Sequence, residues 1–206
     1  MDAQIVFDFL VYMQALSRTV KDGRNIDTVS YCFKMSGFEH WFQFGFAGYL
    51  QNLYPNCNVM TEDMPPINDP NYPYGNVDIS ISPKNAVGNF NTDYIELKCY
   101  TSFLMTENIN NWSARFHNDI VKLNSLPTYT HNGSFNHIGK RTAIAIAVYD
   151  KAPDDEFSLI HNFQQHYTND GVDYYNTIGI MQFGLSNVQP FYFEVLIYNA
   201  LPIWSF

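Results

Sequence analysis

The segment that most restricts the fold is the run TAIAIAVYD at residues 142–150. Successive side chains of a strand point to opposite faces of a sheet. Both alternating sets are apolar over most of this run, so a strand formed by it is buried on both of its faces. The run therefore predicts a central strand, in a sheet that is covered by helices on both sides.

Hydrophobic periodicity predicts the other elements. Four segments are typical of helices: residues 3–20, 36–53, 106–126 and 154–167. Four further segments are typical of strands: residues 77–82, 94–100, 177–183 and 191–198. A strand followed by a helix and another strand usually forms a right-handed crossover. The order therefore predicts an α/β fold with a mixed central sheet flanked by helices.

Two stretches between these elements predict loops. Prolines and asparagines dominate residues 55–74, where a short strand over residues 58–61 is the alternative. A polar loop is predicted to follow the third helix and to extend through Gly139.

Length and composition predict one globular domain. The 206 residues are 46% hydrophobic and only 15% charged, and a chain of this length buries about 70% of its unfolded surface. Cys32, Cys57 and Cys99 lack metal-ligand spacing, so they predict buried thiols in a reducing compartment. Asp8 interrupts the apolar run IVFDFLVYMQAL, and no basic region precedes that run. We therefore expect a core helix of a cytoplasmic protein without membrane contact.

The net charge of −9 argues against a protein that coats nucleic acid through bulk charge. It leaves open an enzyme with a local positive groove. Arg115, Lys122, Lys140 and Arg141 fall in one part of the sequence and are candidates for such a groove. The alternative is that these side chains are solvated and have no binding role.

Three charged residues alternate with apolar ones in the two neighbouring strand segments. Asp78 opposes Val77 and Ile79 in the first strand, and Glu96 and Lys98 oppose the aliphatic positions of the second. If the two strands are neighbours and share one core, all three charged groups lie on the opposite face. The face of an ordinary hairpin is one interpretation. Because helices are predicted to cover both sides of the sheet, an exposed charged face is less expected, and this favours the interpretation that the three residues form a common site.

The motifs VDIS and IELK, followed by RFHNDIVKL in a helix and TAIAIAVYD in a central strand, resemble the PD-(D/E)XK nuclease superfamily. This resemblance implies the restriction-endonuclease-like fold. It covers about residues 36–150, so the N-terminal helix and the C-terminal strands are additions within a single domain of residues 1–206. Val77 stands where the motif that names the family has proline.

The resemblance implies phosphodiester hydrolysis that depends on Mg²⁺ or Mn²⁺, with DNA as the expected substrate and RNA as the alternative. The metal ligands would be Asp78, Glu96 and the backbone carbonyl of Leu97, which are the hard oxygen ligands that Mg²⁺ prefers. Lys98 would contact the attacking water. The setting would be restriction, defence, repair or a toxin.

Family members commonly carry a glutamate on the helix before the aspartate strand, and Glu39 matches it. It would ligate a second metal or hold a metal-bound water. Helical spacing places Glu39 beside a stripe of apolar residues that comprises Phe42, Phe46, Leu50 and Leu53. The competing interpretation is a capping box, because Ser36 and Glu39 fit the pattern S-x-x-E.

Three residues are candidates for substrate contacts: Gln43, Arg115 and Lys122. Gln43 shares the face of Glu39. Asp119 and Lys122 are otherwise predicted on a solvated helix face. A rival function also fits the acidic composition: a non-catalytic inhibitor or immunity protein that binds a basic partner. A homodimer or a complex with a partner protein is compatible with either function.

Overall fold

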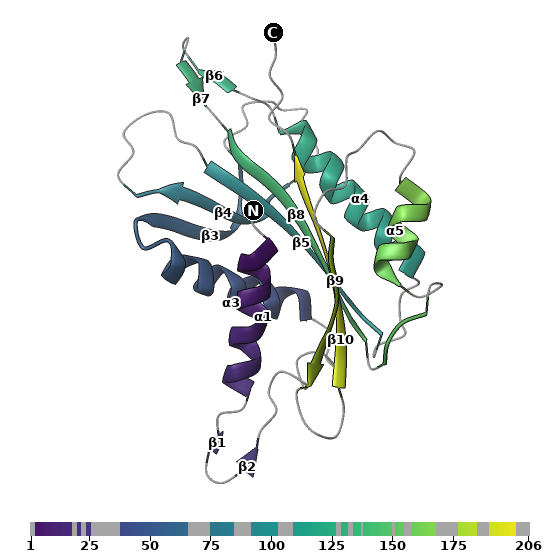
Figure 1. The fold of residues 1–206 in the computed structure, drawn as a ribbon. Coiled ribbons are helices and arrows are strands. Elements are labelled where there is room, and N and C mark those ends of the chain that lie inside the picture. Colours follow the sequence, from purple (N-terminus) through teal and green to yellow (C-terminus); the bar gives the residue numbers. More distant parts are fainter. Residues whose placement is uncertain are drawn as a thin grey trace.

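The computed structural model describes the following residues: 3–17, 20–21, 24–25, 38–65, 75–84, 92–102, 109–126, 129–131, 134–136, 138–149, 151–154, 158–167, 177–184 and 190–200. Within these ranges, six strands form one mixed sheet in the order β3-β4-β5-β8-β10-β9. Helices α1 and α3 lie on one side of the sheet, and α4 and α5 lie on the other (Figure 1). The predicted α/β fold with a mixed sheet and flanking helices is confirmed.

The main elements are α1 (Ala3–Ser17), α3 (Phe38–Leu53), β3 (Cys57–Asp63), β4 (Val77–Pro83), β5 (Thr92–Thr101), α4 (Ile109–Ser125), β8 (Ile138–Tyr149), α5 (Leu159–Tyr167), β9 (Thr177–Gly184) and β10 (Pro190–Ala200). Two small antiparallel pairs join β1 (Val20–Lys21) to β2 (Arg24–Asn25) and β6 (Tyr129–His131) to β7 (Ser134–Asn136). Every predicted helix and strand is present, with shifted ends.

The central position of β8 is confirmed by its neighbours. It is parallel to β5 and antiparallel to β10, and residues 141–149 are all buried. Helix α4 connects β5 to β8, as expected for two parallel strands that need a crossover. Strand β4 is antiparallel to both β3 and β5.

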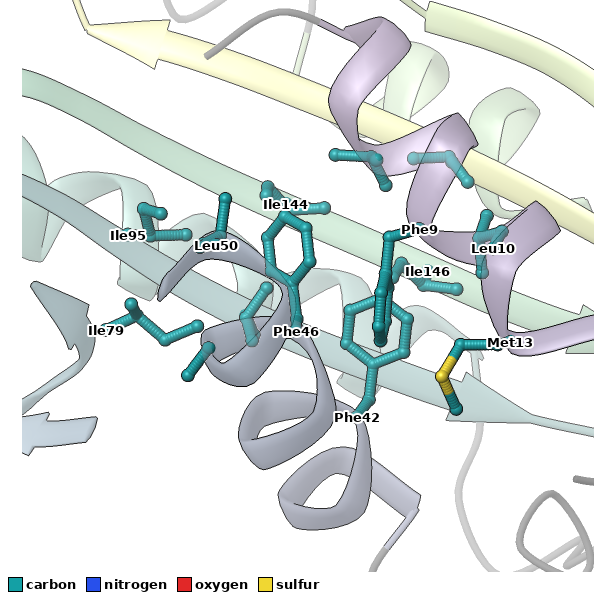
Figure 2. Packing of buried hydrophobic residues seen from close by; sticks show 14 of the residues in the cluster. Phe9, Leu10, Met13, Phe42, Phe46, Leu50, Ile79, Ile95, Ile144 and Ile146 are labelled. Atoms are coloured by element: carbon teal, nitrogen blue, oxygen red, sulfur yellow. The ribbon is translucent and has the colours of Figure 1, made fainter. Parts of the chain in front are cut away.

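The alternation of isoleucine and alanine in β8 separates two cores. Ile144 and Ile146 face the first core, which α1 and α3 cover; Figure 2 shows Phe9, Phe42 and Phe46 from these helices around them. The alanines of β8 face the second core. Their small side chains leave room there for the large aromatic residues of α4 and α5, which comprise Trp112, Phe116 and Phe163.

The N-terminal apolar run forms a core helix, as predicted. The rings of Phe9 and Phe42 meet edge to face, with centroids 5.0 Å apart. None of the helices in the ranges given above is long and apolar enough to cross a membrane. Leu53, expected on the buried stripe, is the last residue of α3 and is 45% exposed. Cys57 and Cys99 are free thiols, and Cys32 lies outside the described residues.

Of the two predictions for the first part of residues 55–74, the loop was wrong and the short strand over residues 58–61 is confirmed, in a longer form, since β3 occupies Cys57–Asp63. This strand pairs with β4 at the edge of the sheet. Its side chains alternate between half-buried and exposed, so few apolar residues mark it in the sequence. The Ser80 hydroxyl of β4 donates to the Asp63 carboxylate at 2.6 Å and joins the two strands further.

The prediction of a loop through Gly139 was also wrong, because β8 begins at Ile138 and β6 and β7 precede it. Gly139 permits the close approach of β8 to β5. A Cβ atom at this position would lie 2.1 Å from Asp93 Oδ1 and 3.0 Å from the Thr92 backbone. The glycine that indicated a loop is therefore a packing requirement between two strands.

Arg141 was a candidate for a positive groove, and the structure contradicts this. It is 3% exposed, and its Nη1 donates to the carbonyls of Leu123 at 3.2 Å and Leu126 at 3.3 Å. The Leu123 carbonyl lies in the last turn of α4 and the Leu126 carbonyl directly follows the helix, where backbone acceptors lack helical partners. Arg141 therefore caps α4 and does not contribute to a surface groove.

A buried carboxylate fixes the start of α5. Glu194 of β10 is 1% exposed. It accepts hydrogen bonds from the hydroxyls of Ser158 and Tyr149, each at 2.7 Å, and from the Leu159 N–H at 2.6 Å. Burial and the neighbouring charge of Glu194 raise the pKa of Tyr149 well above its ordinary value. The carboxylate thus ties the first turn of α5 to two strands of the sheet.

Candidate functional site

The candidate site lies where β4 separates from β5. The paired positions end at Ile79 and Ile95. One residue beyond this point, the Asp78 carboxylate accepts a hydrogen bond from the Leu97 N–H at 2.6 Å. The Asp78 side chain thus replaces the backbone acceptor that β4 no longer offers to the Leu97 N–H. This hydrogen bond places the Asp78 carboxylate against β5.

Glu39 makes the equivalent contact one step further along β5. Its Oε2 accepts from the Cys99 N–H at 2.9 Å, and its Oε1 accepts from Lys98 Nζ at 3.1 Å. The N–H groups of residues two apart point to the same edge of a strand. Carboxylates from β4 and α3 therefore lie along one edge of β5. Ser36, the partner of Glu39 in the capping-box interpretation, lies outside the described residues.

Glu96 and Lys98 both reach residues of α4. Lys122 Nζ lies 2.6 Å from Glu96 Oε1, although the approach is poorly aligned for a hydrogen bond. Lys98 Nζ lies between Glu39 and Asp119, at 3.1 Å and 3.7 Å from their carboxylate oxygens. The two lysines thus have different carboxylate partners, and helices from both layers of the fold contribute to one charged cluster.

Asp119 and Lys122 were predicted on a solvated face, and this was wrong. Their side chains are only 20% and 14% exposed. The available signal was their spacing of three residues on the helix, beside the apolar stripe that includes Ile120 and Leu123. The strand periodicity that identified Asp78, Glu96 and Lys98 carries no information about charged residues on the helix.

Gln43 supports the backbone at Asp78. Its side chain is buried, and Nε2 donates to the Asp78 carbonyl and to Glu62 Oε1, both at 2.8 Å. Glu62 has a positive φ of 52°, a conformation that costs a non-glycine residue about 1 kcal/mol or more and often occurs at functional sites. The sequence did not indicate Glu62. These contacts hold β4 in position at the point where it leaves β5.

Arg115 lies on the exposed surface of α4, one turn before Asp119. Its positive charge opposes the protonated form of Lys98 and tends to lower the pKa of that lysine. Arg115 is therefore close to the charged cluster while its side chain remains accessible. This position is compatible with the predicted contact to a substrate phosphate.

Burial determines the electrostatics of the cluster. It raises the pKa of Glu96 to about 9, the charge of Asp78 adds to this, and Lys122 opposes it. Burial also raises the pKa of Asp119 to about 6, against the opposing charge of Lys98. Burial alone would lower the pKa of Lys98, but the charges of Glu39 and Asp119 outweigh it and the pKa is raised. Lys98 is therefore a cation at neutral pH.

The oxygen atoms of Asp78, Glu96 and Leu97 fit a magnesium ion that keeps several waters better than a metal ion that side chains enclose completely. Among the described residues, no group of three or more His, Cys, Asp or Glu side chains is arranged to hold a metal. Mg²⁺ usually takes one or two carboxylates and keeps several waters. Asp78 and Glu96 supply two carboxylates, and the Leu97 carbonyl points to the same edge as its N–H, toward Asp78. Glu96 Oε1 is buried and already faces a cation, the Lys122 ammonium at 2.6 Å.

The comparisons with known proteins add no relative. No family model, no curated protein and no solved structure matches this chain. The case for a function therefore depends on the geometry of the site.

The pH dependence of stability tests the buried carboxylates. In EDTA, the melting temperature should fall by several degrees between about pH 5 and pH 9. The pKa of Glu96 is 4.5 ordinarily and about 9 in the folded protein. Between these values the folded state binds more protons than the unfolded state, so stability falls as pH rises. Asp119 acts in the same direction at the lower end of this range.

Glu96→Gln is the matched variant, because it removes the titration and keeps the volume of the side chain. Thermal melts of both proteins across this range should show a shallower pH dependence for the variant. Identical pH profiles would mean that Glu96 has no raised pKa.

Proposed function

We propose that this chain is a Mg²⁺- or Mn²⁺-dependent phosphodiester hydrolase with a restriction-endonuclease-like fold, and that it acts as an endodeoxyribonuclease. The observation that carries the proposal is the clustering of Asp78, Glu96 and Lys98 where β4 and β5 separate. The Asp78 carboxylate lies against Leu97, between Glu96 and Lys98 in the chain, and it interacts electrostatically with both residues. The element order supports it: the aspartate strand β4, the Glu-x-Lys strand β5, helix α4 and central strand β8 follow one another as in the PD-(D/E)XK pattern.

Asp78, Glu96 and the Leu97 carbonyl would bind the metal. A bound Mg²⁺ supplies charge neutralisation at the phosphate and a more acidic water. Lys98, held as a cation by Glu39 and Asp119, would orient the attacking water against the phosphate. A residue that orients water needs a fixed position, and two carboxylates from opposite helices restrict this ammonium group.

Substrate binding must depend on local cations, because the chain as a whole carries a net charge of −9. Arg115 and Lys122 are the proposed phosphate contacts beside the cluster. Binding through few such contacts should weaken with added salt less steeply than binding to a broad basic surface. DNA is the proposed substrate, and RNA is the alternative that the assay includes.

The test is incubation of the purified protein with supercoiled plasmid, single-stranded DNA and RNA in Mg²⁺, Mn²⁺ or EDTA. Nicked or linear plasmid should form with either metal and not with EDTA. Cleavage of RNA alone would keep the hydrolase and change the substrate. Absence of cleavage on all three substrates with both metals would contradict the proposed activity.

A second function is favoured by one observation, the acidic charge of the whole chain. A non-catalytic inhibitor or immunity protein would use this charge to bind a basic partner. In that case the carboxylates of Asp78 and Glu39 would only complete the edge of β5. Such a protein should bind its partner in EDTA and should show no metal-dependent cleavage.

Glu39→Gln tests whether Glu39 belongs to the site. Glutamine retains one acceptor oxygen but presents an NH₂ group to the second donor, so either Lys98 or the Cys99 N–H loses its partner. Metal-dependent cleavage should fall by about tenfold or more, as is usual when the support of a site residue is lost. The measurement is the cleavage rate at saturating Mg²⁺. Full activity would leave Glu39 a structural role only.

A further inference from the structure

Lys122, a proposed phosphate contact, also lies against the buried carboxylate of Glu96. Glu96 is 3% exposed, and the Lys122 ammonium lies 2.6 Å from its Oε1. A buried carboxylate requires a cation, a proton or a set of donors. We infer that Lys122 is an internal counterion that balances Glu96 in the metal-free protein and competes with the divalent metal for this carboxylate. The inference rests on the proposed metal site.

The geometry distinguishes Lys122 from Lys98. Lys98 is held by Glu39 and Asp119, and neither residue belongs to the first proposed metal position. Lys122 comes from the last turn of α4 and also donates to the Asn76 carbonyl, immediately before β4. Its ammonium is therefore anchored beside Glu96, next to the strand that carries Asp78.

The charges of the cluster explain why a counterion is needed. Glu39, Asp78, Glu96 and Asp119 supply four carboxylates of the described part of the chain. Lys98 pairs with Glu39 and Asp119, and Lys122 pairs with Glu96. Ion pairs on the surface contribute little, but this pair is largely removed from water, where Coulomb interactions are stronger. A metal at Glu96 must either displace the ammonium or bind against its repulsion.

A divalent ion carries two positive charges, so an ammonium held beside Glu96 opposes its binding at close range. Removing Lys122 should therefore strengthen metal binding at this carboxylate. The same substitution should weaken substrate binding if the displaced ammonium turns to a phosphate.

The experiment is titration of the full chain with Mn²⁺ at pH 8 by calorimetry, with the metal-induced rise in melting temperature as a second readout. Lys122→Met should bind Mn²⁺ about tenfold more tightly than the wild type. Lys122→Gln should show the same direction of change and retains a donor for Glu96, which protects folding. Lys151→Met is the matched control, because Lys151 is exposed just after the end of β8, and it should bind like the wild type.

The outcomes separate the two claims. Tighter binding by the Lys122 variants, or binding by these variants alone, supports the counterion role. Equal affinity in the wild type and in both Lys122 variants overturns this role and leaves the metal site intact. If the wild type and all variants bind no Mn²⁺, the metal site fails and the inference fails with it.

Discussion

Replacing Lys98 with alanine should lower phosphodiester cleavage by about 10²-fold or more at saturating metal, which is the usual effect of losing a positioned acid, base or electrostatic group. The substitution keeps the carboxylates of Asp78 and Glu96. It also removes a positive charge near them, so the divalent metal should bind as well or better. The measurements are the cleavage rate and a Mn²⁺ titration of the same preparation.

Asp78→Asn provides the complementary change. Asparagine keeps an acceptor for the Leu97 N–H and loses the negative charge, so the fold should persist while metal binding and cleavage are both lost. The thermal stabilisation that Mg²⁺ gives to the wild type should also disappear. Lys151→Ala, at an exposed position after β8, serves as the matched control for Lys98→Ala, with unchanged activity expected. Full cleavage by Lys98→Ala would exclude Lys98 from the reaction.

The fold was predictable where burial leaves a periodic pattern. The run at residues 142–150 indicated a central strand because both of its faces are apolar, and the structure has β8 between β5 and β10. Helix α4 was equally clear, since Trp112 and the residues that follow it at helical spacing form a buried stripe. Elements that bury little apolar surface were predicted less well: a strand at β3 was only the alternative to a loop, and the start of β8 was missed. The edge strand β3 and the start of β8 are held by backbone pairing, which leaves no pattern in the side chains.

The site was predictable only in part. Alternation within each strand placed Glu96 and Lys98 together, but it could not show that the pairing of β4 and β5 stops at Ile79. That separation lets Asp78 reach the Leu97 N–H. The contribution of α4 depends on how the helix packs on the sheet. The partnership of Lys98 with Asp119 is therefore a tertiary feature, which strand periodicity does not contain.

Glu194 is the second case of a charged residue whose role depends on tertiary structure. In the sequence it is one acidic residue within an apolar strand, FYFEVLIY. In the structure its two carboxylate oxygens accept hydrogen bonds from the hydroxyls of Ser158 and Tyr149 and from the Leu159 N–H. A buried carboxylate is tolerated when hydrogen bonds replace its hydration, and this one has three donors at 2.6–2.7 Å.

Glu194→Ala should destabilise the fold by about 3–5 kcal/mol, because it leaves two buried hydroxyls without their acceptor and takes from the Leu159 N–H the nearer of its two acceptors. For a chain of this size the loss corresponds to a fall of roughly 10 °C or more in melting temperature. Glu194→Gln keeps one acceptor oxygen and should lose about half as much. Asp8→Ala, which removes an exposed carboxylate of α1, should change stability by less than about 0.5 kcal/mol.

Thermal or urea unfolding in EDTA measures this effect without a contribution from metal binding. Glu194 lies in β10, on the far side of β8 from β5, so the variant should retain Mn²⁺ binding at low temperature while its melting temperature falls. That combination separates support of α5 from a role in the metal centre. A melting temperature within about 1 °C of the wild type would show that water replaces the carboxylate without loss, and that the first turn of α5 does not depend on Glu194.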